Sequence, residues 1–157
     1  LYMDTIDEKS REGVLEFTHR ILPLLYLKGT ILPDIEVEYP EANERFVTEE
    51  QWEFVFTSLR EKFGADDEYW IIDPQYINET EPLKASLAEN LADIYQDMKD
   101  VSILYQKNTL ASRQNAVHDC KELFGNHWGY RIGNLMTRLH HMIYGVQDDH
   151  IESLDIL

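Results

Sequence analysis

Three aspartates on one predicted helix are the residues whose spacing best suits chemistry. Asp93, Asp97 and Asp100 follow one another at intervals of four and three residues. On a helix this spacing directs the three carboxylates to the same side. Mg²⁺ binds one or two carboxylates together with water and a substrate phosphate. The row is therefore consistent with a metal-assisted hydrolase that acts on a phosphorylated small molecule.

One straight helix cannot surround an ion, so such a site needs ligands from a second helix. Glu16 and His19 form an E-x-x-H pair, the unit that supplies ligands in di-iron bundles. No second E-x-x-H pair and no glycine-rich phosphate loop occurs in the sequence. We therefore favour a solvated helix face, or a set of partners for Arg131 and Arg138, over a metal site. No cofactor is predicted.

Nucleophilic catalysis is not indicated by the sequence. Cys120 falls on an apolar helical stripe, and no serine occupies a strained turn of the kind that exposes a nucleophile. The sequence thus assigns no catalytic residue, and we lean towards a protein that is not an enzyme.

A row of glycines is the second unusual pattern. Gly125, Gly129 and Gly133 recur every fourth residue, and each costs about 1 kcal/mol relative to alanine inside a helix. The favoured explanation is close approach of another helix, or a helix break at Gly125. The alternative is a groove that a partner's backbone enters, and this alternative makes four residues candidates for partner binding. They are Trp128, Gly129, Tyr130 and Arg131, of which Trp, Tyr and Arg are enriched at interface hot spots.

Charge is unevenly distributed along the chain, whose formal net charge is −16. Residues 30–100 carry 19 Asp and Glu against five Lys and Arg, whereas residues 101–147 carry two acidic and five basic residues. An acidic surface repels phosphate backbones, so a nucleic-acid partner is not expected. A protein partner with a basic surface is expected instead. A single cysteine fits a reducing cytoplasm, and no apolar stretch approaches the roughly 20 residues that span a bilayer.

Apolar periodicity predicts helices in four regions. The first covers residues 10–28, is kinked at Pro23 and is capped by Gly29. The second begins with a capping box at Thr48 and Gln51 and ends at Gly64. The third covers residues 83–105 and has a heptad seam. The fourth region, residues 110–144, has helical spacing throughout, with a possible break near residue 126.

The predicted fold is an all-α, single-domain bundle of about five to six helices with two long loops. One loop, residues 33–46, is acidic, and the other, residues 65–82, is rich in aromatic residues. Neither contains a convincing pair of strands. We expect residues 1–147 to form the domain and residues 148–157 to form an acidic tail. Residues 1–7 are typical of the end of a helix, which predicts a further helix before them.

Four segments together resemble a known bacterial family. They are "LPLLYLKGTILP", "FVTEEQWEFV", "LADIYQDMKD" and "HWGYRIGNLMTRLHHMIYG". In this order they are similar to the uncharacterised domain of unknown function 5063, which is common among Bacteroides-like bacteria. The resemblance implies a small cytoplasmic all-α protein with one more helix before Leu1. It implies no activity and no site residues.

The sequence as a whole favours a non-enzymatic acidic module that binds or regulates a protein in the bacterial cytoplasm. The metal-assisted hydrolase is the alternative. The oligomeric state is not predicted.

Overall fold

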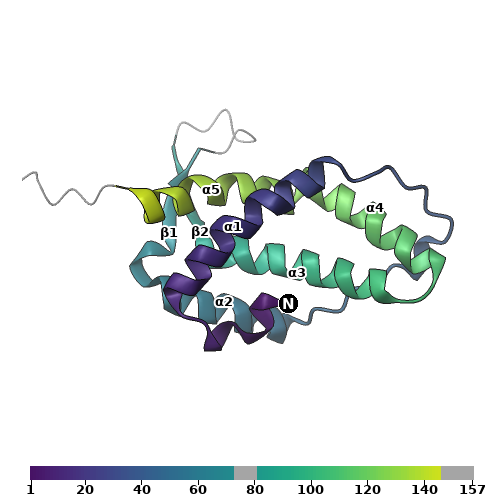
Figure 1. Ribbon diagram of the computed structural model, residues 1–157, viewed down its shortest axis with the longest axis horizontal. Helices are drawn as coiled ribbons and strands as arrows, with labels where there is room; N and C mark the ends of the chain where they lie inside the picture. Colours follow the sequence, from purple (N-terminus) through teal and green to yellow (C-terminus); the bar gives the residue numbers. More distant parts are fainter. Residues whose placement is uncertain (73–80, 146–157) are drawn as a thin grey trace, which may run out of the picture.

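The computed structural model describes residues 1–72 and 81–145 of the chain, and helices dominate this part (Figure 1). The elements in chain order are η1 (Tyr2–Glu8), α1 (Arg11–Thr30), η2 (Pro40–Ala42), α2 (Glu49–Phe63), η3 (Gly64–Asp66), β1 (Glu68–Ile71), β2 (Leu83–Ser86), α3 (Leu87–Gln106), α4 (Leu110–Asn126) and α5 (Trp128–Tyr144). The predicted all-α bundle is confirmed. The predicted domain end at residue 147 and the tail lie outside the described residues. Among the described helices, none is long and apolar enough to cross a membrane.

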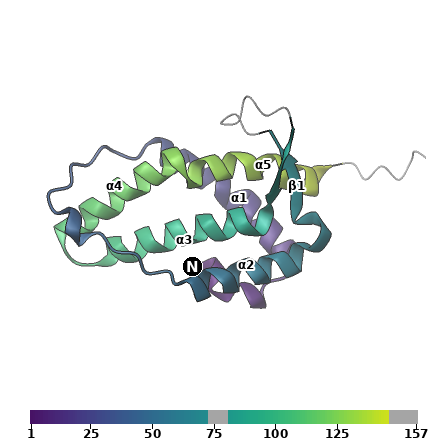
Figure 2. The ribbon, with the colours of Figure 1, turned by 180° about the vertical axis from the view of Figure 1, so that it is seen from behind.

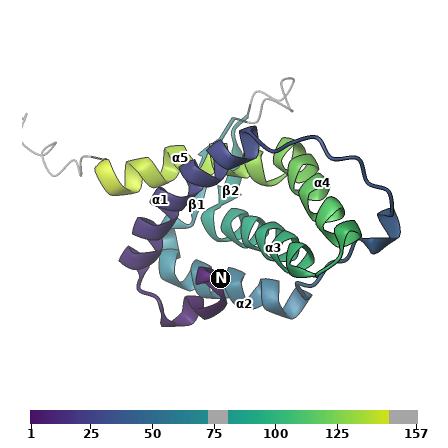
Figure 3. The same cartoon turned by 45° about the vertical axis from the view of Figure 1, so that its right-hand side comes forward.

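Helix α3 lies at the centre of the bundle. It packs against α2, α4 and α5, whereas α1 packs mainly against α5. Figure 3 shows α3 between α2 on one side and α4 on the other, with α1 crossing in front of α5. The heptad seam explains this position, because Leu87, Leu91 and Ile94 are buried. The seam loses its burial towards its C-terminal end, where Tyr105 is exposed.

Helix α1 begins as its sequence predicts and ends differently. Ser10 caps its N-terminus by accepting a hydrogen bond from the Gly13 amide. The helix continues through Pro23 and past Gly29 to Thr30. The prediction that Gly29 is the C-terminal cap is therefore wrong.

Gly29 is instead a point of close contact between helices. A Cβ atom at this position would lie 2.5 Å from Cε2 of Phe124 and 2.7 Å from Cη2 of Trp128. Only a residue without a side chain fits where α1 crosses the junction of α4 and α5. This packing is why a glycine is tolerated inside the helix.

Helix α2 matches its prediction at both ends. Thr48 and Gln51 form the reciprocal capping box. Gly64 ends the helix with a φ of 54°, a conformation that favours glycine. Val55, Leu59 and Phe63 are buried on its inner face.

The structure contains a β-hairpin that was not predicted: β1 lies in the predicted loop of residues 65–82, and β2 takes residues 83–86, which were predicted as the start of the third helix. β1 and β2 are antiparallel, with Tyr69 opposite Ala85 and Trp70 opposite Lys84. The buried carboxylate of Asp67 fixes the hairpin to α3, because it accepts hydrogen bonds from the Ala88 amide at 2.7 Å and from the Ser86 hydroxyl at 2.8 Å. The expectation of no strand pair is therefore wrong.

The acidic connector between α1 and α2 runs along the outside of α4 (Figures 1 and 2). It forms no strand, and the short η2 is its one helical turn. The Ile35 carbonyl contacts His118, and the Tyr39 carbonyl accepts a hydrogen bond from Asn115. These contacts fix the connector to α4 through its backbone, which leaves the alternating glutamates 36 and 38 exposed.

We predict that Gly29→Ala lowers the free energy of unfolding by about 1–3 kcal/mol, because the added methyl group overpacks the contact with Phe124 and Trp128. The matched control is Gly125→Ala, since a Cβ there meets no atom within 4 Å. The control should be as stable as the wild type or slightly more stable. Urea unfolding measures both. Equal stability of the two variants would contradict the close contact at Gly29.

Candidate functional site

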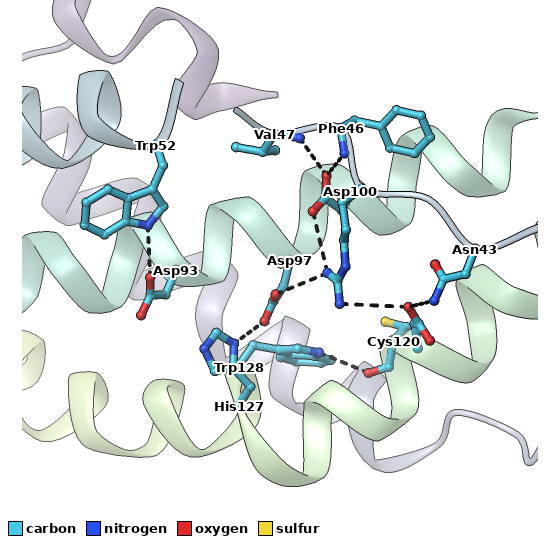
Figure 4. Close-up of polar contacts among 12 residues, drawn as sticks. Asn43, Phe46, Val47, Trp52, Asp93, Asp97, Asp100, Cys120, His127 and Trp128 are labelled. Atoms are coloured by element: carbon cyan, nitrogen blue, oxygen red, sulfur yellow. Dashed lines mark hydrogen bonds and ion pairs between the residues drawn. The ribbon is translucent and has the colours of Figure 1, made fainter. Parts of the chain in front are cut away.

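The first aspartate of the row joins three helices. Asp93 of α3 accepts a hydrogen bond from Nε1 of Trp52 in α2 at 2.9 Å and from Nε of Arg131 in α5 at 2.8 Å. Figure 4 shows the indole of Trp52 directed at this carboxylate. Each oxygen therefore has a donor from a different helix, and the predicted pairing with Arg131 is confirmed.

The second aspartate holds the junction between α4 and α5. Oδ2 of Asp97 forms a short contact with Nδ1 of His127, the residue that separates the two helices. Oδ1 lies 3.8 Å from the guanidinium of Arg45 in the connector. Asp97 is only 4% exposed, so its charge depends on these partners.

The third aspartate fastens the end of the connector. Oδ1 of Asp100 accepts hydrogen bonds from the backbone amides of Phe46 at 2.7 Å and Val47 at 2.8 Å (Figure 4). Its other oxygen lies 3.5 Å from Arg45. Arg45 also approaches Asp119 of α4, which in turn accepts a hydrogen bond from Asn43. The connector thus meets α3 and α4 through one network of ion pairs and hydrogen bonds.

These contacts correct the favoured interpretation of the row. A solvated face is wrong for Asp97 and Asp100, which are 4% and 2% exposed. Arg138 is not a partner of the row, because its guanidinium binds the carbonyl and carboxylate of Asp66. The sequence pattern could not distinguish a carboxylate row in water from one buried under a connector.

The second half of the predicted metal site lies elsewhere. Glu16 pairs with Arg20 on the surface of α1 at 2.7 Å. The His19 ring contacts the rings of His140 and Tyr144 on α5. Within residues 1–72 and 81–145, no group of three or more His, Cys, Asp and Glu side chains could hold a metal ion. The alternative of a metal-assisted hydrolase gains no support from this geometry.

The pair of Asp97 and His127 has the form of a carboxylate that orients a general base. A base also needs a cavity in which a substrate can reach it. Neither Asp97 nor His127 lines the surface hollow beside Gly129 or the one beside β1. Nearby, burial together with the charges of Asp97 and Asp119 raises the pKa of the Cys120 thiol to about 11. The thiol is therefore protonated at neutral pH and is a poor nucleophile.

The three glycines of the row have different surroundings. A Cβ atom on Gly129 would meet the Phe124 carbonyl and lie 2.6 Å from its ring, so this glycine is required by the fold. A Cβ atom on Gly125 or Gly133 would meet nothing within 4 Å. The explanation by close approach of another helix holds for Gly129 and fails for the other two.

The row lines a hollow of about 330 Å³ at the surface. We call this hollow the glycine groove and define it by all the residues that line it. They are Tyr26, Phe124, Gly125, Gly129, Tyr130, Gly133 and Asn134. Gly125 lies in the last turn of α4 whereas Gly129 and Gly133 belong to α5, so the groove spans the junction of the two helices.

The partner-binding candidates divide into two groups. Gly129 and Tyr130 line the glycine groove. Trp128 is wrong as a contact residue, because it is 1% exposed and donates from its indole to the Cys120 carbonyl. Arg131 turns away from the groove to bind Asp93.

An exposed apolar ridge that was not predicted lies at the end of α1, the helix that contributes Tyr26 to the groove. Leu24 and Leu27 of α1 and Ile31, which directly follows the helix, lie three and four residues apart and are 47%, 59% and 65% exposed. Tyr26 of the same helix packs against Phe124 at the groove. Apolar side chains occur on both sides of this helix, and only the position of α1 against its neighbours shows which side is exposed.

Comparisons with other proteins agree on one relationship. A model of the family described as "Domain of unknown function (DUF5063)" matches residues 1–145. The crystal structure of protein BF1032 from Bacteroides fragilis is similar to this chain, with a TM-score of 0.80 and 32% sequence identity. The match covers 93% of this chain and 85% of that one. No curated protein matches the chain.

We predict that Asp100→Ala lowers the free energy of unfolding by about 2–4 kcal/mol, because it leaves the part-buried amides of Phe46 and Val47 without an acceptor. Asp100→Asn keeps one acceptor oxygen and should lose less. Glu16→Ala is the surface control, and its change should stay within about 0.5 kcal/mol. Denaturant unfolding compares the three variants. A loss for Asp100→Ala no larger than that of the control would show that the network does not hold the connector.

Proposed function

The chain belongs to the DUF5063 family, and we propose that it is a non-enzymatic module that binds a protein partner through the glycine groove. The observation that carries the proposal is the open space beside Gly125 and Gly133. Gly133 lies inside α5, where glycine costs about 1 kcal/mol relative to alanine, and Gly125 lies in the last turn of α4. The contacts within the chain do not require this cost, so an external partner that approaches the helix backbone accounts for it.

The surroundings of the groove support a protein partner over a small polar ligand. Tyr26, Phe124 and Tyr130 supply aromatic walls, and the ridge of Leu24, Leu27 and Ile31 lies at the end of α1. Clustered exposed apolar side chains of this kind mark protein contact sites. Backbone approach at glycines suits a helix or an extended segment of the partner.

Charge supports a basic partner. The acidic connector starts at the end of α1, directly after the ridge, and carries exposed Glu36, Glu38 and Glu41. No ion pair in the described part of the chain uses these three glutamates. A basic surface would meet unneutralised carboxylates there and would associate faster at low salt. The reducing bacterial cytoplasm is the compartment that we propose, in line with the free thiol of Cys120.

The proposal is tested by affinity capture from extracts of a bacterium that encodes the protein. Gly133→Leu fills the groove, and Thr57→Leu adds the same side chain at an exposed position of α2. We expect the wild type and Thr57→Leu to retain the same partner, and Gly133→Leu to lose it while its melting temperature stays unchanged. Retention should fall as salt rises from about 50 to 200 mM. Equal capture by both variants would contradict the proposal.

A second prediction adds one methyl group at Gly133 or at Gly129 to separate an effect on partner binding from an effect on folding. Gly133→Ala should raise the free energy of unfolding by up to about 1 kcal/mol through helix propensity, and it should weaken partner capture. Gly129→Ala should instead destabilise the protein, because its Cβ has no room beside Phe124. Thermal unfolding together with capture checks both. A Gly133→Ala variant that is more stable and binds as well as the wild type would contradict the groove as the contact site.

A further inference from the structure

The β-hairpin has a free edge beside a second hollow. In the described ranges, β1 pairs with β2 and with no other strand. A hollow of about 640 Å³ is lined by the five consecutive residues 68–72 and by no residue of β2. Successive side chains of a strand point to opposite faces. A hollow that touches five residues in succession therefore follows the edge of the strand, where backbone N–H and C=O groups are available.

The opposite wall of this hollow is one polar face of α5. Asn134, Thr137, Arg138 and His141 occupy positions i, i+3, i+4 and i+7 of the helix, and all four line the hollow. Figure 1 shows β1 on the side of the hairpin nearer the C-terminal end of α5. A strand added beside β1 would therefore cross this face.

Arg138 has a hydrogen-bonding group that its neighbours leave unused. Its Nη2 donates to the carbonyl of Asp66 at 3.1 Å and contacts the Asp66 carboxylate at 3.4 Å. A hydrogen bond from Arg11, assisted by its charge and that of Arg138, lowers the pKa of Asp66, so this anchor stays ionised. Nε of Arg138 is buried and has no hydrogen-bond partner among the described residues. A buried donor without an acceptor is costly, so a shift of the Arg138 side chain towards an acceptor in the hollow would relieve that cost.

These features define the chemistry of the occupant. The strand edge recognises an extended backbone, as in β-strand addition. Arg138 and His141 favour a carboxylate, and charge-assisted hydrogen bonds to arginine are the strong ones. Exposed Trp70 and Ile72 offer apolar contact to alternate side chains of an added strand.

We propose that the free edge of β1 and the polar face of α5 bind an extended peptide segment that carries acidic side chains. This site is separate from the glycine groove and does not depend on the function proposed for it. The net charge of −16 repels acidic peptides in general. Binding of the acidic peptide would therefore result from the hydrogen-bond donors of this site.

The test uses two synthetic seven-residue peptides, blocked at both ends, in which valine alternates with glutamate or with lysine. We expect the glutamate peptide to protect the amides of residues 68–72 in hydrogen exchange and to change the fluorescence of Trp70. His141→Glu should weaken this binding about tenfold, and Arg138→Gln should weaken it by a similar factor. His141 is exposed, so its variant remains informative even if Arg138→Gln unfolds.

Thr57→Glu is the control for added charge, and it should leave the affinity within about twofold. Three results would overturn the proposal. The first is that the glutamate peptide does not protect the amides of residues 68–72 from hydrogen exchange. The second is that only the lysine peptide protects them. The third is that His141→Glu and Thr57→Glu lower the affinity for the glutamate peptide equally. The same peptides added to Gly133→Leu should bind as they do to the wild type, which separates this site from the groove.

Discussion

Burying two carboxylates on the central helix is the constraint on which the rest of this structure depends. Asp97 and Asp100 are almost fully removed from water, and an unpaired charge in such a position is strongly destabilising. Their partners come from the connector and from the junction of α4 and α5. Satisfying the two charges therefore fixes the course of the connector and the point where the last two helices meet. The apolar core of α3 alone would specify neither.

Local chemistry made the helices predictable, because each signal acts within a few residues. The capping box at Thr48 and the helix end at Gly64 depend on neighbours in sequence, and both were predicted. Gly29 and the hairpin were not predicted, because their reasons lie far along the chain. Glycine is needed at position 29 because Phe124 and Trp128 pack against it. Tyr69 of β1 lies opposite Ala85 of β2, 16 residues further along the chain. No spacing rule within one segment contains that information.

The candidate sites were predictable only in outline, for a related reason. Helical spacing correctly placed Asp93, Asp97 and Asp100 on one side of α3, but it could not say what covers that side. The glycine row was correctly identified as unusual, and the structure separates Gly129, which the fold requires, from Gly133, which it does not. The polar face of α5 beside β1 was not predicted as a site, because such a site depends on the edge of β1 and neither strand was predicted.

The position of His127 gives the glycine groove a thermodynamic link to a distant surface. Gly125 and Gly133 stand on opposite sides of this residue, so the width of the groove depends on how α4 and α5 are inclined to each other. The side chain of His127 shares Asp97 with Arg45 of the connector. If a ligand changes that inclination and with it the contact of His127 with Asp97, it also changes the stability of the connector. By reciprocity, a molecule that immobilises the connector then changes the affinity of the groove by the same factor. Such coupling would pass through the carboxylate of Asp97.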